Sequence, residues 1–142
     1  MAYVKIYVHA VWGTKNRYPY LNSEIKSKVI DHIKENAIAK QIHIDRINGV
    51  SDHLHCLIAL NADMSVAKTL NLIKGESAFW INKNSITKLK FEWADEYYAA
   101  SIGESGLSRV RAYIDNQEVR HRKLTFSEEY KSFVDQSGIF QG

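Results

Sequence analysis

The spacing of hydrophobic residues along this chain changes repeatedly between the alternation typical of strands and the spacing typical of helices. The order of these changes limits the folds that the chain can adopt. Apolar and other side chains alternate along residues 3–13, which predicts a strand covered on both faces. Residues 23–37 place apolar side chains at helical spacing, as expected of an amphipathic helix. Residues 42–47 and 53–60 again favour strands, and the turn-forming residues 49–52 between them predict a hairpin.

The same alternation of periods continues beyond the hairpin. Helical spacing predicts a second helix over residues 66–83. Both helices have capping residues before them, from Asn22 or Ser23 for the first and from residues 61–65 for the second. Aromatic residues that favour strands predict a fourth strand over residues 91–102, although two acidic residues interrupt it.

The last part of the chain favours helices. Residues 103–106 read as a flexible connector because they begin and end with glycine. Ser105 or Ser108 can cap a third helix that runs to about Lys123. Residues 125–128 have the spacing of a capping box, which predicts a short helix at the tail.

The predicted order is therefore strand, helix, strand, strand, helix, strand, followed by helices. This is the split βαβ, or ferredoxin-like, arrangement. We expect an α+β fold in which an antiparallel sheet carries helices on one face and is followed by a C-terminal helix. The length of 142 residues suits one domain, so we expect residues 1–142 to form a single unit.

Composition excludes several classes of protein. No stretch approaches the roughly 18 apolar residues of a membrane span, and the N-terminal residues lack the pattern of a secretory signal. The single cysteine, Cys56, cannot form an internal disulfide, which agrees with a reducing compartment and a cytoplasmic location. The net charge of +3 is too small to indicate a nucleic-acid partner by itself.

Two histidines flank a leucine at the start of the third predicted strand. Because side chains alternate along a strand, His53 and His55 share one face, whereas Leu54 and Cys56 face the opposite side. Two imidazole nitrogens on one face can chelate a single divalent ion. Cys56 points away from them, which argues against a structural zinc site. Two surface or hydrogen-bonded histidines remain the alternative interpretation.

The third predicted helix supplies further polar side chains. Tyr113, Gln117 and His121 follow one another at intervals of one helical turn and form a polar stripe. A tyrosine that only packs and a glutamine without a role are the alternative interpretation. An apolar stripe that could dock the helix runs beside them through Leu107, Val110 and Ile114.

These side chains together fit metal-assisted chemistry on a phosphodiester. A tyrosine with a pKa of about 10 is a poor nucleophile at neutral pH unless its electrophile is activated. A divalent ion activates a phosphodiester by polarising a phosphoryl oxygen. Two imidazoles and an amide oxygen suit Mg²⁺ or Mn²⁺. On this interpretation Tyr113 would be the nucleophile and His53, His55 and Gln117 the metal ligands, whereas the alternative interpretations give them no catalytic role.

These residues resemble a known family, the single-tyrosine HUH transposases of small bacterial insertion sequences. One departure is the stretch WADEYY at residues 93–98, where the family has a pattern close to Trp-Gln-x-Gly-Tyr. This departure bears on local contacts with DNA or a second subunit and leaves the catalytic residues intact. The likeness extends over nearly the whole chain, through the segments HAVWGTK, DHLHCLI, LNLIKGESAFWIN, FEWADEYYAASI and YIDNQEVRHRKLTFSEEY.

The resemblance implies the same roles for the four candidate site residues. It further implies cleavage of single-stranded DNA through a 5′-phosphotyrosine intermediate with a free 3′-OH, and rejoining by reversal of that step. It also implies an obligate homodimer that binds imperfect hairpins at the ends of a mobile element. In such a dimer the tyrosine helix of one subunit completes the histidine site of the other, which the connector at residues 103–106 would permit.

Hairpin binding would depend on phosphate contacts and on stacking of extruded bases. Four of the six arginines fall between residues 109 and 122, although such a run is also typical of a solvated helix face. Two other functions remain open: a ferredoxin-like nucleic-acid-binding module without catalysis, and a domesticated relative that processes repetitive palindromic DNA. The candidate phosphate contacts are Arg109, Arg111, Arg120, Arg122, Lys68, Lys74 and Lys83.

Overall fold

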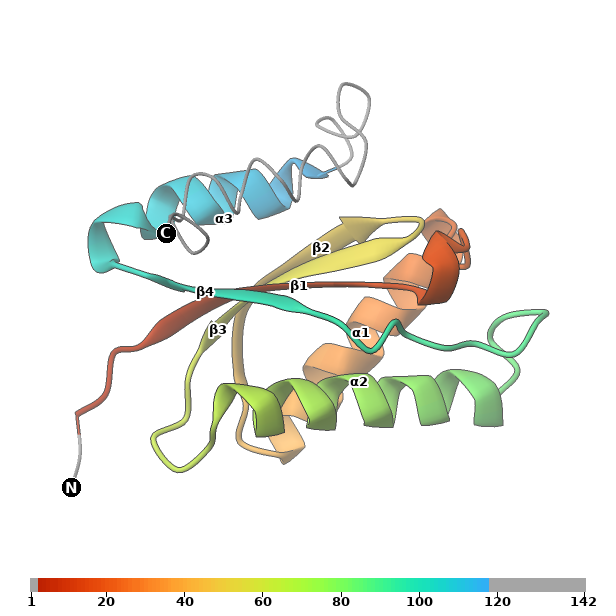
Figure 1. Ribbon diagram of the computed structural model, residues 1–142, viewed down its shortest axis with the longest axis horizontal. Helices are drawn as coiled ribbons and strands as arrows, with labels where there is room; N and C mark the ends of the chain where they lie inside the picture. Colours follow the sequence, from red (N-terminus) through yellow and green to blue (C-terminus); the bar gives the residue numbers. More distant parts are fainter. Residues whose placement is uncertain (1–2, 118–142) are drawn as a thin grey trace.

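The computed structural model describes residues 3–117 as an antiparallel sheet with helices on its two faces (Figure 1). The strand order is β2-β3-β1-β4, so β3 and β1 lie at the centre. The predicted ferredoxin-like α+β fold is confirmed. Its elements are β1 (Tyr7–Gly13), η1 (Lys15–Arg17), α1 (Ser23–Ala39), β2 (His43–Val50), β3 (His53–Ala59), α2 (Val66–Lys83), β4 (Tyr98–Ile102), η2 (Glu104–Gly106) and α3 (Leu107–Asp115).

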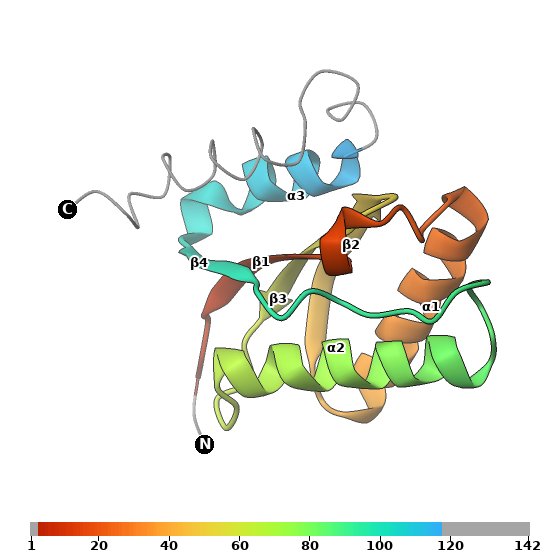
Figure 2. The same ribbon diagram turned by 45° about the vertical axis from the view of Figure 1, so that its right-hand side comes forward.

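The helices divide between the two faces of the sheet, as Figures 1 and 2 show from two directions. α1 and α2 cover one face, as expected from the sequence, and α3 lies across the opposite face over β2 and β3. Among the described residues, no helix has the length and apolar character needed to cross a membrane.

Because side chains alternate along the central strands, different residues are buried on the two faces of the sheet. Toward α1 and α2, β3 directs Leu54, Cys56 and Ile58 into the main core, where they are fully or almost fully buried. The residues between them, with their neighbours on β1, face α3 instead. Leu57 packs there against Leu107 and Ile114 of α3. Any polar side chain of β3 on this second face therefore lies beneath α3.

The predicted caps of the first two helices are confirmed. Asn22 caps α1 by accepting a hydrogen bond from the backbone N–H of Ile25, and Ser65 caps α2 by accepting one from Lys68. The predicted serine caps of α3 are wrong, because the 3₁₀ turn η2 runs directly into this helix and places Gly106 at its N-cap.

The described part of the predicted third helix is α3, which runs from Leu107 to Asp115. It ends at Asp115, where the side-chain amide of Asn116 donates to the carbonyl of Ala112 and caps the last turn. The predicted continuation to about Lys123 and the tail helix at residues 125–128 fall outside the described residues.

Two strand boundaries also differ from the prediction. β4 comprises only Tyr98–Ile102, because Phe91 and Trp93 turn their rings into the core and Trp93 forms only an isolated bridge with Thr14. β2 continues through Gly49 to Val50, which shortens the predicted turn. A Cβ at Gly49 would collide with the backbone of His53, so glycine permits the close approach of β2 to the start of β3.

Candidate active site

The two histidines of β3 lie side by side beneath α3. The exposed fraction is 0% for His53 and 1% for His55, and their ring centroids are 5.2 Å apart. The structure therefore agrees with the expectation that both imidazoles share the face opposite the main core. It does not agree with the alternative that they are surface histidines, and it shows that each has a hydrogen-bonding partner.

His53 is held by the residue that precedes it. Its Nδ1 lies 2.8 Å from Oδ1 of Asp52. Asp52 is itself fixed, because its carbonyl accepts hydrogen bonds from the backbone and the hydroxyl of Thr14 at the end of β1. A carboxylate at Nδ1 favours the tautomer that carries its proton there, which leaves Nε2 of His53 able to bind a cation.

His55 is held by a histidine that the sequence did not mark as functional. Nε2 of His9, on β1, lies 3.0 Å from Nδ1 of His55, and the exposed fraction of His9 is 1%. The alternation of β1 places His9 on the face away from the main core, so its position was predictable. Its contact with His55 was not predictable, because this contact depends on the register between β1 and β3.

Tyr113 reaches the same place from α3. Its ring centroid is 5.4 Å from that of His55 and 6.2 Å from that of His9, with edge-on geometry in both cases. The tyrosine side chain is half-buried and its hydroxyl oxygen is buried. The predicted nucleophile and the predicted histidine pair are thus together in one chain.

Gln117 is fully buried one turn beyond Tyr113, at 0% exposure. Its Nε2 makes a long hydrogen bond of 3.4 Å to the carbonyl of Tyr113. Its Oε1 is buried and has no hydrogen-bond partner among the described residues. An unsatisfied buried acceptor costs about 1–3 kcal/mol, so this oxygen fits a site for an electropositive ligand.

The chemistry of the donor set limits which cation could bind there. Within residues 3–117, no group of three or more His, Cys, Asp or Glu side chains is arranged to hold a metal ion. A metal site that includes His53 and His55 therefore needs a third ligand that is not His, Cys, Asp or Glu. The amide oxygen of Gln117 can be such a ligand. The residues present fit a divalent cation with open positions for phosphate oxygens.

Hydrogen bonds with side chains of β2 hold α3 in place over this site. Arg111 donates two hydrogen bonds of 2.8 Å to the carboxylate of Asp45. The amide of Asn48 donates to the carbonyls of Ile114 and Asp115, at 3.1 and 3.3 Å. The guanidinium of Arg111, through its hydrogen bonds, holds the pKa of Asp45 below its ordinary value. Since α3 packs on β2 and β3 of its own chain, the structure pairs Tyr113 with His55 of the same chain.

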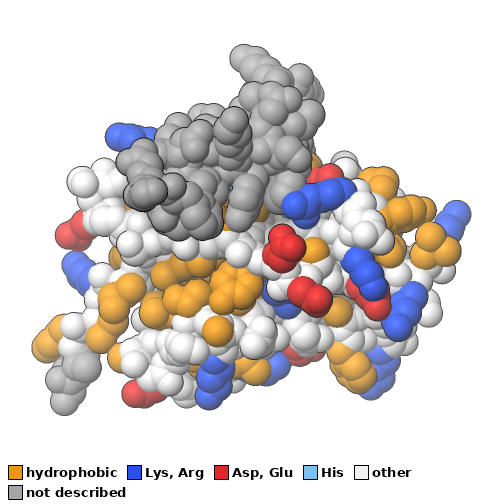
Figure 3. All heavy atoms as spheres, viewed as in Figure 1, with side chains coloured by type: hydrophobic (Ala, Val, Ile, Leu, Met, Phe, Trp, Pro, Cys, Tyr) orange, Lys and Arg blue, Asp and Glu red, His pale blue; other side chains and the backbone are white. Residues whose placement is uncertain are grey.

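The predicted phosphate contacts that fall within residues 3–117 do not gather around this site. Lys68, Lys74 and Lys83 lie on α2, which covers the opposite face of the sheet. Arg111 is engaged by Asp45, whereas Arg109 on the same helix is exposed. Among the described residues visible in Figure 3, Lys and Arg side chains are dispersed with acidic side chains between them. Arg120 and Arg122 fall outside the described residues, as does His121 of the predicted polar stripe.

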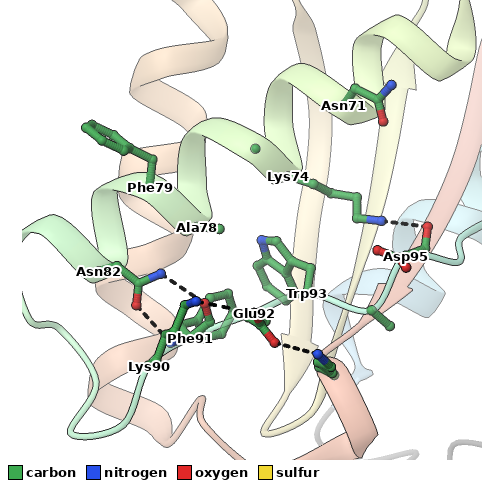
Figure 4. Close-up of a pocket in the computed structure, with 13 residues that line it drawn as sticks. Asn71, Lys74, Ala78, Phe79, Asn82, Lys90, Phe91, Glu92, Trp93 and Asp95 are labelled. Atoms are coloured by element: carbon green, nitrogen blue, oxygen red, sulfur yellow. Dashed lines mark hydrogen bonds and ion pairs between the residues drawn. The ribbon is translucent and has the colours of Figure 1, made fainter.

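A hollow of about 630 Å³ lies between α2 and residues 90–95, away from the histidines (Figure 4). Lys74 lines it and donates to the carbonyl of Asp95 at 3.1 Å, and burial lowers the pKa of this lysine. Trp93 lies on its wall and donates from its indole nitrogen to Ser77. Residues 93–98, where the sequence departs from the family pattern, therefore begin at this hollow.

A ferredoxin-like sheet that carries a histidine pair on a central strand, with a tyrosine on a helix across that face, defines the class of single-tyrosine HUH proteins. Comparisons of the sequence place the chain within that class. The family model of the IS200-like transposases matches residues 2–117, and the chain belongs to this family of enzymes. The predicted resemblance is thus confirmed.

Individual relatives share the family likeness at low identity. The chain is 24% identical over 115 residues to the transposase of insertion sequence element IS200 from Salmonella typhimurium, across 77% of this chain and 74% of that protein. It is 19% identical over 114 residues to the ISDra2 transposase TnpA of Deinococcus radiodurans, across 77% of this chain and 81% of that protein.

Solved structures share the fold. A Deinococcus radiodurans protein assigned as a transposase superposes with a TM-score of 0.63 at 22% identity, over 82% of this chain and 95% of that one. A REP-associated tyrosine transposase bound to a REP hairpin superposes with a TM-score of 0.60 at 17% identity, over 85% of this chain and 72% of that one.

Proposed function

We propose that this IS200-like transposase cleaves and rejoins single-stranded DNA with Tyr113 as the nucleophile and a divalent cation held by His53, His55 and Gln117. The observation that carries the proposal is the distance of 5.4 Å between the ring centroids of Tyr113 and His55. No disulfide or other covalent link creates this contact. It results from the packing of α3 on a sheet face that otherwise buries three histidines.

The reaction follows from the chemistry of the phenol. The Oη of Tyr113 loses its proton and forms a bond to phosphorus, and the bond between phosphorus and the 3′-oxygen breaks. That oxygen takes up a proton to become a free 3′-OH, which balances the proton lost by the phenol. The 5′-phosphate stays on the tyrosine. Attack by a 3′-OH on this phosphotyrosine reverses the step and rejoins a strand without an external source of energy.

The histidines and the glutamine would hold the cation and direct it toward the scissile phosphate. When bound, Mg²⁺ or Mn²⁺ would polarise a phosphoryl oxygen and stabilise the charge that develops there. Asp52 and the buried surroundings keep His53 fixed before DNA arrives. The buried Oε1 of Gln117, which has no hydrogen-bond partner within residues 3–117, supports its role as the third ligand.

The DNA partner we propose is a single strand that carries hairpins. A solved relative of the same fold is bound to a REP hairpin, and the chain belongs to the IS200-like transposases. Arg109 is exposed on the tyrosine helix and is suited to a phosphate contact near the site. We also propose that the protein is a homodimer, as the family resemblance implies.

The test is a covalent adduct formed with DNA from the flanks of the gene. Single-stranded DNA labelled at its 3′ end is incubated with the protein and Mn²⁺ and separated under denaturing conditions. We expect the wild type to retain label, Tyr113→Phe to lose it, and Tyr7→Phe to retain it. Tyr7 is a matched control because it packs against the same apolar cluster beneath α3. Label on the Tyr113→Phe protein would overturn the assignment of the nucleophile.

A further inference from the structure

We propose that His9 is a positioning residue that prepares His55 to bind the cation, by accepting a hydrogen bond from its Nδ1. This inference rests on the proposed function, because it concerns the same cation. It adds a role for a residue of β1 that the proposed function does not use.

The contact is short and shielded from water. Nε2 of His9 and Nδ1 of His55 are 3.0 Å apart, and both side chains are 1% exposed. Their ring centroids are 5.2 Å apart with the ring planes inclined by 33°. β1 pairs with β3 on one side and with β4 on the other, so the strand that carries His9 is fixed along both edges. Water is therefore a poor substitute for either partner.

The direction of this hydrogen bond decides what His55 can do. A neutral imidazole carries one proton on either Nδ1 or Nε2, and only the nitrogen without a proton can bind a cation. If His55 donates from Nδ1 to His9, its Nε2 is available. If His9 donates instead, the proton of His55 is on Nε2 and that atom cannot be a ligand. The proposal therefore requires His9 to be the acceptor.

His53 shows the same arrangement with a different acceptor. Its Nδ1 lies 2.8 Å from the carboxylate of Asp52. Metal-binding histidines in proteins usually donate their other N–H to a carboxylate or another acceptor, which fixes the tautomer and the orientation of the ring. In this chain both His53 and His55 have such a contact. The partner of His53 is the residue directly before it, whereas the partner of His55 is His9 on another strand, β1.

The test measures cation binding without DNA, because His9 also lies near the ring of Tyr113. We would titrate metal-free protein with Mn²⁺ and record the free cation by electron paramagnetic resonance. Loss of an outer partner of a metal ligand weakens binding about 10–100-fold. We expect a loss of that size for His9→Leu, which removes the acceptor. We expect near wild-type affinity for His9→Gln, whose amide oxygen can reach the position of Nε2.

Val8→Ala provides a control for general weakening of β1. Val8 precedes His9 and is buried on the other face of the sheet, so this variant should lower stability and leave Mn²⁺ affinity unchanged. Equal losses in His9→Leu and Val8→Ala would overturn the proposal, as would wild-type affinity in His9→Leu or a full loss in His9→Gln. A wild type that does not bind Mn²⁺ would instead contradict the proposed metal ligands.

A second measurement needs no variant and remains decisive if His9→Leu does not fold. The nitrogen chemical shifts of ¹⁵N-labelled imidazoles report which ring nitrogen carries the proton. In the metal-free wild type we expect His55 to carry its proton on Nδ1 and His9 to have a bare Nε2. A proton on Nε2 of His55 would overturn the proposal.

Discussion

At the scale of single residues, the site is notable for how many polar groups it places out of reach of water. His9, His53, His55 and Gln117 are each at most 1% exposed. Burial of this kind is costly unless the groups are hydrogen-bonded. Each of the three histidines has a hydrogen-bond partner at 3.0 Å or less. The amide oxygen of Gln117 has none among the described residues. We therefore expect a bound cation to affect stability most through its contact with Gln117.

We predict that Gln117→Met separates stability from metal binding. Methionine is similar in volume and removes an acceptor that has no partner in the described part of the chain, so the metal-free variant should unfold at the same temperature as the wild type or above it. A ligand at 100 times its dissociation constant stabilises a protein by about 2.7 kcal/mol. Mn²⁺ should therefore raise the unfolding temperature of the wild type but not that of Gln117→Met.

Thermal unfolding followed by circular dichroism, with and without Mn²⁺, checks this prediction. Gln41→Met is a control, because Gln41 lies outside the site in the turn after α1. A Gln117→Met protein that is stabilised by Mn²⁺ as strongly as the wild type would show that the amide is not a ligand.

At the scale of elements, the position of α3 depends on an irregularity in β2. The register between β2 and β3 shifts between Ile44 and Arg46, so Asp45 is the extra residue of a β-bulge. A bulge redirects a side chain, and here the carboxylate of Asp45 meets the guanidinium of Arg111 on α3. The bulge thus fixes the helix that carries Tyr113 over the histidines.

We predict that Asp45→Asn lowers the free energy of unfolding by about 1–2 kcal/mol at neutral pH, since hydrogen bonds to charged groups are worth about 1.5–3 kcal/mol and this pair is partly exposed. Asp115→Asn is the matched control, because its contact with Arg46 is a longer, exposed ion pair of 3.6 Å. Chemical denaturation measures both. Equal effects of the two variants would show that the bulge does not fasten α3.

The same pair predicts a dependence on pH. The pKa of Asp45 lies below its ordinary value of 3.8 in the folded state, so folding favours the ionised carboxylate. Its contribution to stability is complete above the ordinary value and disappears as the pH falls through the lower, folded-state value. The difference between wild type and Asp45→Asn should therefore shrink as unfolding is measured at progressively more acidic pH. A difference that stays constant would contradict the assignment.

Some features of these elements could be predicted from the sequence, and others could not. The periods of two and 3.6 predicted the strands, the first two helices and the shared face of His53 and His55, because these features depend on local spacing. The bulge at Asp45 and the contact of His9 with His55 depend on how distant strands align. Phe91 and Trp93 have strand-favouring side chains that pack in the core instead, so local preference extended β4 too far.

At the scale of the whole molecule, the two faces of the sheet serve different purposes. The face under α1 and α2 holds the main apolar core, and the face under α3 holds the candidate catalytic groups. The resemblance implies that α3 of one subunit completes the site of another. The structure places α3 over the sheet of its own chain, with Tyr113 beside the histidine pair of that chain.

We therefore predict that two defective variants do not complement each other. Tyr113→Phe retains the histidines, and His55→Ala retains the tyrosine. If each site is built from one chain, a mixture of the two proteins, unfolded and refolded together, forms no adduct with labelled DNA. Wild-type protein refolded in the same way is the control. Adduct formation by the mixture would show that α3 is exchanged between subunits.

The central claim is that the phenol of Tyr113 becomes joined to DNA, and one measurement tests it most directly. The adduct is digested with nuclease and trypsin, and the peptide AYIDNQEVR, residues 112–120, is identified by mass spectrometry. We predict that this peptide carries a nucleotide linked through a 5′-phosphate to its single tyrosine. An adduct whose nucleotide is found on a different peptide, with Tyr113 unmodified, would contradict the account.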